Sequence, residues 1–266
     1  MANNPMFNEA AFERAKKQQQ TAPSATPSQE EALRAEGFEP HYTVNVFNTM
    51  TLQGTINKTF VLLFLCVVGG WIGLTYFSTR IGILGFGALL ALVIGIWTSL
   101  KPKVAPITAP IYAIIEGILL GGISAIYNAQ YPGIVASAIG ITFLVFAIML
   151  FVYKTGIIKV TQGFVTAIVS ATFAIAILYF GSFILSLLGM NISYLTSSSP
   201  LSIGISVVVC IVAALNLMLD FEFINRMTSR GAAPKFMEWY AGFGLLVTIV
   251  WLYIEILKLL AKSKRR

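Results

Sequence analysis

Charged side chains are scarce in this sequence, and long stretches contain none at all. Only 11% of the 266 residues are charged, whereas 57% are hydrophobic. Soluble domains carry about 25% charged residues, because their surfaces must be hydrated. A mean hydropathy of +0.80 therefore excludes a water-soluble globular fold and indicates an integral membrane protein.

Histidine, aspartate and cysteine are almost absent. The single histidine is His41, the single aspartate is Asp220, and the two cysteines, Cys66 and Cys210, lie within apolar runs. One histidine excludes a multi-histidine metal site and a serine–histidine dyad within the bilayer. One aspartate excludes a two-aspartate intramembrane protease, unless a glutamate substitutes. No nucleotide-binding glycine motif follows a predicted strand. We therefore expect no enzymatic activity, no catalytic residue and no cofactor.

The net charge of +7 belongs to the apolar part of the chain. Residues 1–58 carry a net charge of −1 and residues 59–266 a net charge of +8. Basic residues gather in short loops between apolar runs, as expected beside an anionic lipid leaflet. No basic stripe with interleaved aromatic residues is present, so we expect a lipid bilayer and not nucleic acid as the partner.

Residues 1–45 are polar and contain the segment QQQTAPSATPSQEE. We predict a disordered cytoplasmic tail, because this segment has too few apolar residues to bury a core. We expect no cleavable signal peptide. Residues 46–262 are predicted to form the transmembrane domain, and residues 263–266 a basic C-terminal end.

Seven apolar runs follow the tail. A helix of about 20 residues crosses the roughly 30 Å hydrocarbon core of a bilayer. We therefore predict an all-α polytopic membrane protein with seven transmembrane helices at about residues 59–77, 81–100, 104–127, 133–153, 164–190, 201–219 and 239–257.

The positive charges of the loops predict the orientation. They lie in the tail and in the loops after the second, fourth and sixth runs, which places the N-terminus in the cytoplasm. Seven crossings would put the C-terminus outside, although Lys258 and residues 262–266 carry five positive charges. Six crossings with one re-entrant segment is the alternative.

Small residues recur at four-residue spacing on three of the predicted helices. Such stripes let helix backbones approach closely, and we interpret them as packing surfaces. Their members are Gly69 and Gly73 on the first helix, Gly87, Ala91 and Gly95 on the second, and Ala113, Gly117, Gly121 and Ala125 on the third.

Carboxylates within apolar runs are the main functional signal. Glu116 lies near the middle of the third run, where an ionised group costs at least about 2.5–3.5 kcal/mol. It should face the bundle interior, either as a proton or cation ligand or as a structural carboxyl group. Asp220 and Glu222 end the sixth run and precede basic residues, so they form either an ion-binding or gating site or an interfacial acid–base cluster.

The seventh run carries a carboxylate near each end. Glu238 opens the run, where a negative charge suits a helix N-terminus. Glu255 lies near the other end and has Lys258 three residues later. This spacing favours an ion pair at the protein surface. A secondary place in an ion pathway or gate is the alternative for Glu238, Thr248 and Glu255.

Several segments resemble the Bax inhibitor-1 family. ALNLMLDFEFI (214–224) is similar to the end of its sixth helix, and WLYIEILKLL (251–260) is similar to its closing pattern. NTMTLQGTINKT (48–59), the Glu116–Gly117 pair and PKFMEWY (234–240) are similar to its bacterial branch of uncharacterised membrane proteins. The resemblance covers roughly residues 45–262.

The resemblance implies six helices around a central seventh in a bacterial plasma (inner) membrane. It also implies a pH-sensitive calcium leak, with relatives that modulate a membrane AAA protease or cell death. An aspartate at the end of the sixth helix pairs in this family with an aspartate of the seventh. The first carries over to Asp220, whereas the second falls at Thr248 or, with a shifted alignment, at Glu255. Glu116 or Glu222 is a hypothetical substitute.

Two functional hypotheses follow. In the first, the bundle conducts or senses cations, with Asp220 and Glu116 as ligands for calcium, which prefers oxygen ligands. In the second, the protein transports nothing and regulates membrane proteolysis or a stress response, and a partner binds the tail at residues 1–45.

Overall fold

The computed structural model describes residues 49–77, 81–188, 197–229, 231 and 233–265. These residues belong to one compact unit, residues 45–266. The predicted tail, residues 1–45, lies outside the described residues.

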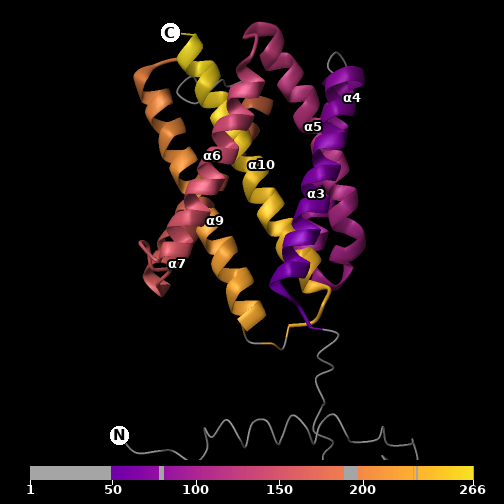
Figure 1. Cartoon of the computed structure of the whole chain (residues 1–266). Helices are drawn as coiled ribbons and strands as arrows, with labels where there is room; N and C mark the ends of the chain where they lie inside the picture. The colour runs from indigo at the N-terminus through magenta and orange to yellow at the C-terminus, as the bar shows by residue number, and fades with distance from the viewer. Residues whose placement is uncertain (1–48, 78–80, 189–196, 230, 232, 266) are drawn as a thin grey trace, which may run out of the picture. The chain divides into compact units, whose positions relative to one another are not determined.

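The described part of the chain is built from helices, as the sequence predicts. Seven α-helices run in succession, and no strand separates them in the described residues (Figure 1). A π-helical turn, Gly73–Phe77, follows the first helix, and a 3₁₀ turn, Pro102–Val104, precedes the third. The helices are α3 (Leu52–Ile72), α4 (Ile81–Leu100), α5 (Ala105–Gln130), α6 (Ile134–Thr155), α7 (Gln162–Leu187), α9 (Pro200–Ser229) and α10 (Met237–Lys264).

The last two helices are longer than the apolar runs from which they were predicted. Helix α9 continues to Ser229, so Asp220 and Glu222 lie inside it and not at its end. An ion pair between Glu222 and Arg226 one turn later supports this extension. Helix α10 likewise continues to Lys264. Polar residues outside the hydrocarbon core can prolong a helix, and hydropathy alone does not reveal this.

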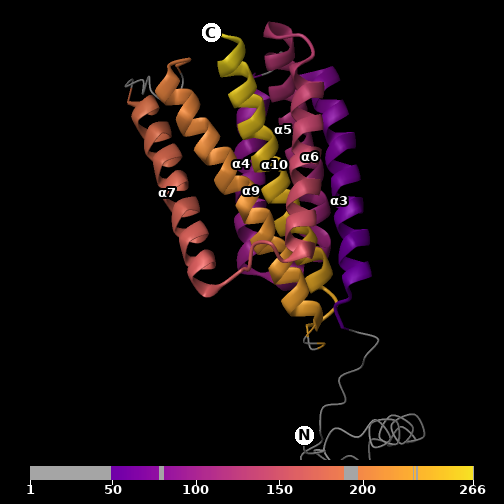
Figure 2. The same cartoon turned by 60° about the vertical axis from the view of Figure 1, so that its left-hand side comes forward.

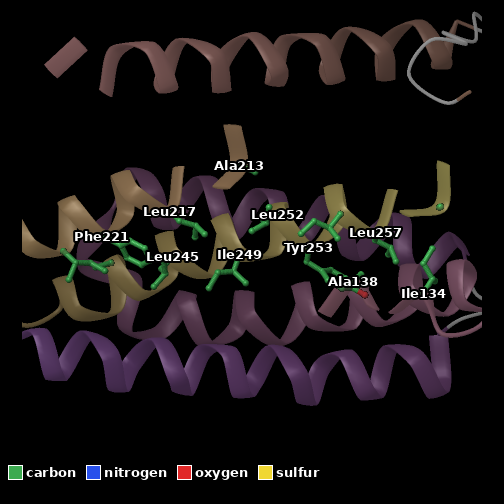
Figure 3. Close-up of a cluster of buried hydrophobic side chains, with 14 of the residues drawn as sticks. Ile134, Ala138, Ala213, Leu217, Phe221, Leu245, Ile249, Leu252, Tyr253 and Leu257 are labelled. Atoms are coloured by element: carbon green, nitrogen blue, oxygen red, sulfur yellow. The ribbon is translucent and has the colours of Figure 1, made fainter. Parts of the chain in front are cut away.

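Helix α10 is the central helix of the bundle. It packs against α3, α5, α6 and α9, and it lies between its neighbours in both views of the bundle (Figures 1 and 2). Figure 3 shows Leu245, Ile249 and Leu252 of α10 among apolar side chains of α6 and α9. This arrangement agrees with the central seventh helix that the family resemblance implies.

Glycines bring α3 and α5 into backbone contact. A Cβ atom added at Gly117 would overlap the backbone of Cys66, and one at Gly121 would overlap the backbone of Gly70. A Cβ at Gly69 would overlap the backbone of Ile114. The small residues predicted to form a packing surface therefore do so between the first and third helices.

The first and last helices begin at the same end of the bundle. The N–H of Met50 donates a hydrogen bond of 2.7 Å to the carbonyl of Ala233, and Thr49 forms a bridge with Pro234. The end of α10 lies at the opposite end (Figure 1). The chain therefore runs from one end of the bundle to the other an odd number of times between the start of α3 and the end of α10.

Six of the helices are long and apolar enough to cross a membrane within the described residues. The remaining helix, α4, has 20 residues and none of them is charged. Seven crossings remain a prediction, with six crossings and one re-entrant segment as the alternative.

Candidate functional site

A cavity of about 1110 Å³ lies inside the bundle, with walls from α4, α5, α7, α9 and α10. Two of its lining residues, Glu116 and Asp220, are the carboxylates that the sequence analysis placed in an ion pathway. Asn216 and Thr248 add an amide and a hydroxyl group to the same walls. Most of the other lining residues are apolar, so the polar groups are few and concentrated.

Asp220, which lines this cavity, has a buried oxygen without a partner in the described residues. Its Oδ2 is buried and has no hydrogen-bond partner among the described residues. Its Oδ1 would lie 3.8 Å from a Cβ atom added at Gly244 of α10, an ordinary van der Waals distance, so the carboxyl group packs against the central helix. A buried oxygen without a partner loses its hydration, and an entering cation or donor would restore a contact.

Thr248 lies beside Asp220, one turn beyond Gly244 on α10, and its hydroxyl is a neighbouring polar group of the carboxyl. This hydroxyl also donates a hydrogen bond of 3.2 Å to the carbonyl of Gly244. Of the two positions that the family resemblance offered for the partner of Asp220, the structure places Thr248 there. A threonine is neutral, so this chain has no second carboxylate at that place.

Glu116 enters the cavity from α5. Tyr112, one turn earlier, lines the same cavity, as expected for residues four apart on one helix face. The ring of Tyr112 packs edge-on against Phe243 of α10, with centroids 5.0 Å apart. This contact sets the position of α5 against the central helix and holds Glu116 toward the interior.

Asn216 is a site residue that the sequence analysis missed. Its side-chain amide donates hydrogen bonds to Thr172 Oγ1 of α7 at 2.8 Å and to the carbonyl of Val212 at 2.9 Å. It lies one turn before Asp220 on the same helix. Its position four residues from an embedded aspartate, within an apolar run, was the available signal.

Glu222 lines the cavity, but both of its carboxylate oxygens are already engaged. Arg226 donates to Oε1 at 2.5 Å, and the hydroxyl of Tyr153 donates to Oε2 at 2.9 Å. This geometry favours the interfacial acid–base cluster over a free ion ligand. Glu222 therefore contributes less to the site than Asp220 and Glu116.

Glu238 lies outside the cavity and is only 1% exposed. It occupies the first turn of α10, as predicted. Its Oε1 accepts hydrogen bonds from the backbone N–H of Thr51 at 3.1 Å and from the Thr51 hydroxyl at 2.9 Å. Glu238 thus joins the N-terminus of α10 to that of α3.

Glu255 pairs with Lys258, as predicted, but not at the protein surface. The Nζ of Lys258 lies 3.1 Å from Oε1, and Glu255 is only 1% exposed. The expectation of a surface pair was wrong because Tyr179 of α7 covers the carboxylate and donates a hydrogen bond of 2.9 Å to Oε2. The spacing of Glu255 and Lys258 along α10 could not reveal that a residue of α7 covers the carboxylate.

No group of three or more histidine, cysteine, aspartate or glutamate side chains comes together within the described residues. Calcium takes six to eight oxygen ligands, so Asp220 and Glu116 would supply only part of a coordination shell. The residues of the cavity fit a cation that keeps much of its water, as in passage or weak binding, better than a tightly held ion.

Comparison with known families finds one match that spans nearly the whole chain. A family model described as Bax inhibitor 1 like matches residues 4–265. A search of curated proteins finds no match.

Proposed function

The chain belongs to the Bax inhibitor 1 like family, and we propose that it is a multi-pass membrane protein that lets cations, calcium among them, leak through the cavity of its bundle. Asp220 and Glu116 are the proposed ligands. The observation that carries the proposal is that Asp220 and Glu116 line one cavity, while the buried Oδ2 of Asp220 has no partner in the described residues.

The length of the cavity supports a pathway. Its lining residues on α10 run from Tyr240 to Ile254, a rise of about 21 Å. This is more than half of the roughly 30 Å hydrocarbon core of a bilayer. A cation that entered near Arg226 and Tyr240 could therefore pass through the cavity for most of the crossing. Packed protein would block only the last part.

Beyond Ile254, polar side chains pack against one another and close the end of the cavity. Ser124 Oγ and the hydroxyl of Tyr253 lie 2.6 Å apart and are buried, and Glu255 is held by Tyr179 and Lys258. We propose that these contacts form the gate that must open for conduction. From the loop charges we propose that the start of α3, and with it the Arg226 end of the cavity, faces the cytoplasm. From the family resemblance we propose that the membrane is a bacterial plasma membrane.

Calcium flux into liposomes that contain the purified protein tests this function. We expect Asp220→Asn and Glu116→Gln each to reduce flux by about tenfold, because each removes a charge worth about 1.4 kcal/mol or more to an ion in transit. Glu238→Gln is the matched control, since it neutralises a buried glutamate outside the cavity. Equal flux from wild type, both variants and empty vesicles would rule the function out.

The second candidate is a regulator of membrane proteolysis or of a stress response. The polar segment at residues 1–45 motivates it, because a polar stretch of this length offers a partner such as a membrane AAA protease a point of attachment. Deletion of residues 2–45 should then abolish recovery of the partner while the bundle stays folded. Unchanged recovery would count against this candidate. Neither proposal includes an enzymatic reaction or a resident cofactor.

A further inference from the structure

The mouth of the cavity lies on the side of the bundle, at the level of its apolar surface. Several residues line the cavity and are also exposed, so they mark where it opens. Ser99, Leu100 and Arg226 mark the opening near Tyr240. The opening on the side is marked by Ala88, Leu92 and Ile96 of α4, Val169 of α7 and Val247 of α10. Val247 is the most informative, since it belongs to the central helix and is nevertheless 36% exposed.

The arrangement of the helices explains this opening. Helix α4 packs on α5, whereas α7 packs on α9. Figure 2 shows α7 at the edge of the bundle beside α9. Helices α4 and α7 line the same cavity but pack on different neighbours. Part of the central helix, at Val247, is therefore uncovered between them. In a membrane, this side opening faces lipid chains.

The charges inside the cavity favour a cation. Asp220 and Glu116 line it, and the Oδ2 of Asp220 has no partner among the described residues. The cation in the described lining is Arg226, which is already paired with Glu222. A ligand with a positive head and an apolar body would satisfy both the carboxylates and the aliphatic walls.

We infer that the cavity binds a lipophilic amine that enters from the bilayer between α4 and α7, with its ammonium group at Asp220 and Glu116 and its alkyl chain along Leu92, Val169 and Val247. A volume of about 1110 Å³ slightly exceeds the roughly 300–1,000 Å³ of pockets that hold drug-sized ligands, so an alkyl amine has room there. The site coincides with the proposed cation pathway, but binding requires neither conduction nor a gradient.

Photolabelling of the full chain in lipid nanodiscs tests this inference. The probes are a dodecylamine and a dodecanol that carry the same diazirine in the alkyl chain, and the labelled residues are located by peptide mass spectrometry. We expect the amine to label the lining of α4, α7 and α10 at least about tenfold more than the alcohol does, because a charge-assisted hydrogen bond adds to burial of the chain.

Three variants locate the head group and the entrance. Asp220→Asn should reduce labelling of the cavity by the amine about tenfold, while Asp220→Glu retains most of it. Ala88→Trp should block labelling by filling the mouth. Leu89→Trp, one residue further on the same helix, is the matched control, because Leu89 is exposed but does not line the cavity.

Each outcome decides the matter. Equal labelling of the cavity by amine and alcohol, or amine labelling that survives Asp220→Asn, overturns the inference. Labelling that Ala88→Trp leaves unchanged overturns entry between α4 and α7. Specific amine labelling in a protein that conducts no calcium would support the binding site and refute the conduction pathway, so the two proposals can fail separately.

Discussion

The hydroxyl of Tyr179 donates a hydrogen bond of 2.9 Å to the carboxylate of Glu255, although the two residues are 76 positions apart in the sequence. The bond joins α7 to the central helix α10. Lys258 reinforces it, because its Nζ pairs with the other oxygen of Glu255 and lies 4.8 Å from the centre of the Tyr179 ring. Three side chains therefore hold the peripheral helix α7 to the centre of the bundle.

Tyr179→Phe should destabilise the protein by about 1–3 kcal/mol, because it leaves a buried carboxylate oxygen without its donor. The measurement is unfolding of the purified protein in detergent micelles with increasing dodecyl sulfate, followed by circular dichroism. Tyr76→Phe is the control, since it removes the hydroxyl of an exposed tyrosine. Equal midpoints for the two variants would show that the bond to Glu255 contributes nothing to stability.

Thr51→Ala should be destabilising by about 2 kcal/mol, although Thr51 itself is exposed. Its hydroxyl caps α3 by accepting a bond from the N–H of Gly54 and also donates to the buried Glu238. Thr166→Ala is the matched control, because within the described part of the chain that hydroxyl bonds to the carbonyl one turn earlier in its own helix and to no other helix. The same unfolding assay applies, and a Thr51→Ala midpoint no lower than that of the control would contradict the role assigned to this contact.

Gly117→Ala should destabilise the bundle by about 1–3 kcal/mol, because the added methyl group would overlap the backbone of Cys66 and push α3 away from α5. Gly140→Ala is the matched control, since it makes the same change at a helical glycine that has space around it. Gly140 also lies within a helix, but a Cβ added there meets no atom within 4 Å, so alanine should be neutral or stabilise by up to about 1 kcal/mol. Comparable loss in both variants would refute close packing of α3 on α5.

Ser229→Cys and Ser263→Cys should be labelled from opposite sides of the membrane, because α9 and α10 end at opposite ends of the bundle (Figure 1). Both serines are exposed. The measurement uses a membrane-impermeant maleimide on intact and permeabilised cells, in a background with Cys66→Ala and Cys210→Ala. Labelling of both positions from one side would show that α10, the helix between them, does not cross the membrane.

The sequence by itself determined the class of fold and the residues worth following. Within a bilayer the backbone must satisfy its own hydrogen bonds, so uncharged runs of this length have to form helices. Embedded carboxylates are costly, so Glu116 and Asp220 were conspicuous without any structure. The packing surfaces formed by small residues of α3 and α5 could also be predicted from the sequence, because four-residue spacing puts these residues on one face of a helix.

Only the tertiary structure decided which of these side chains meet. It brought Glu116 and Asp220 to one cavity, placed Thr248 beside Asp220, and buried Glu255 under Tyr179. Helical periodicity reports which residues share a face, but not how each helix is rotated against its neighbours or which helix lies beside it. The rotation and the neighbours of each helix depend on packing between segments far apart in the chain. They determine whether Glu255 and Lys258 form a surface ion pair or a buried contact that holds the bundle together.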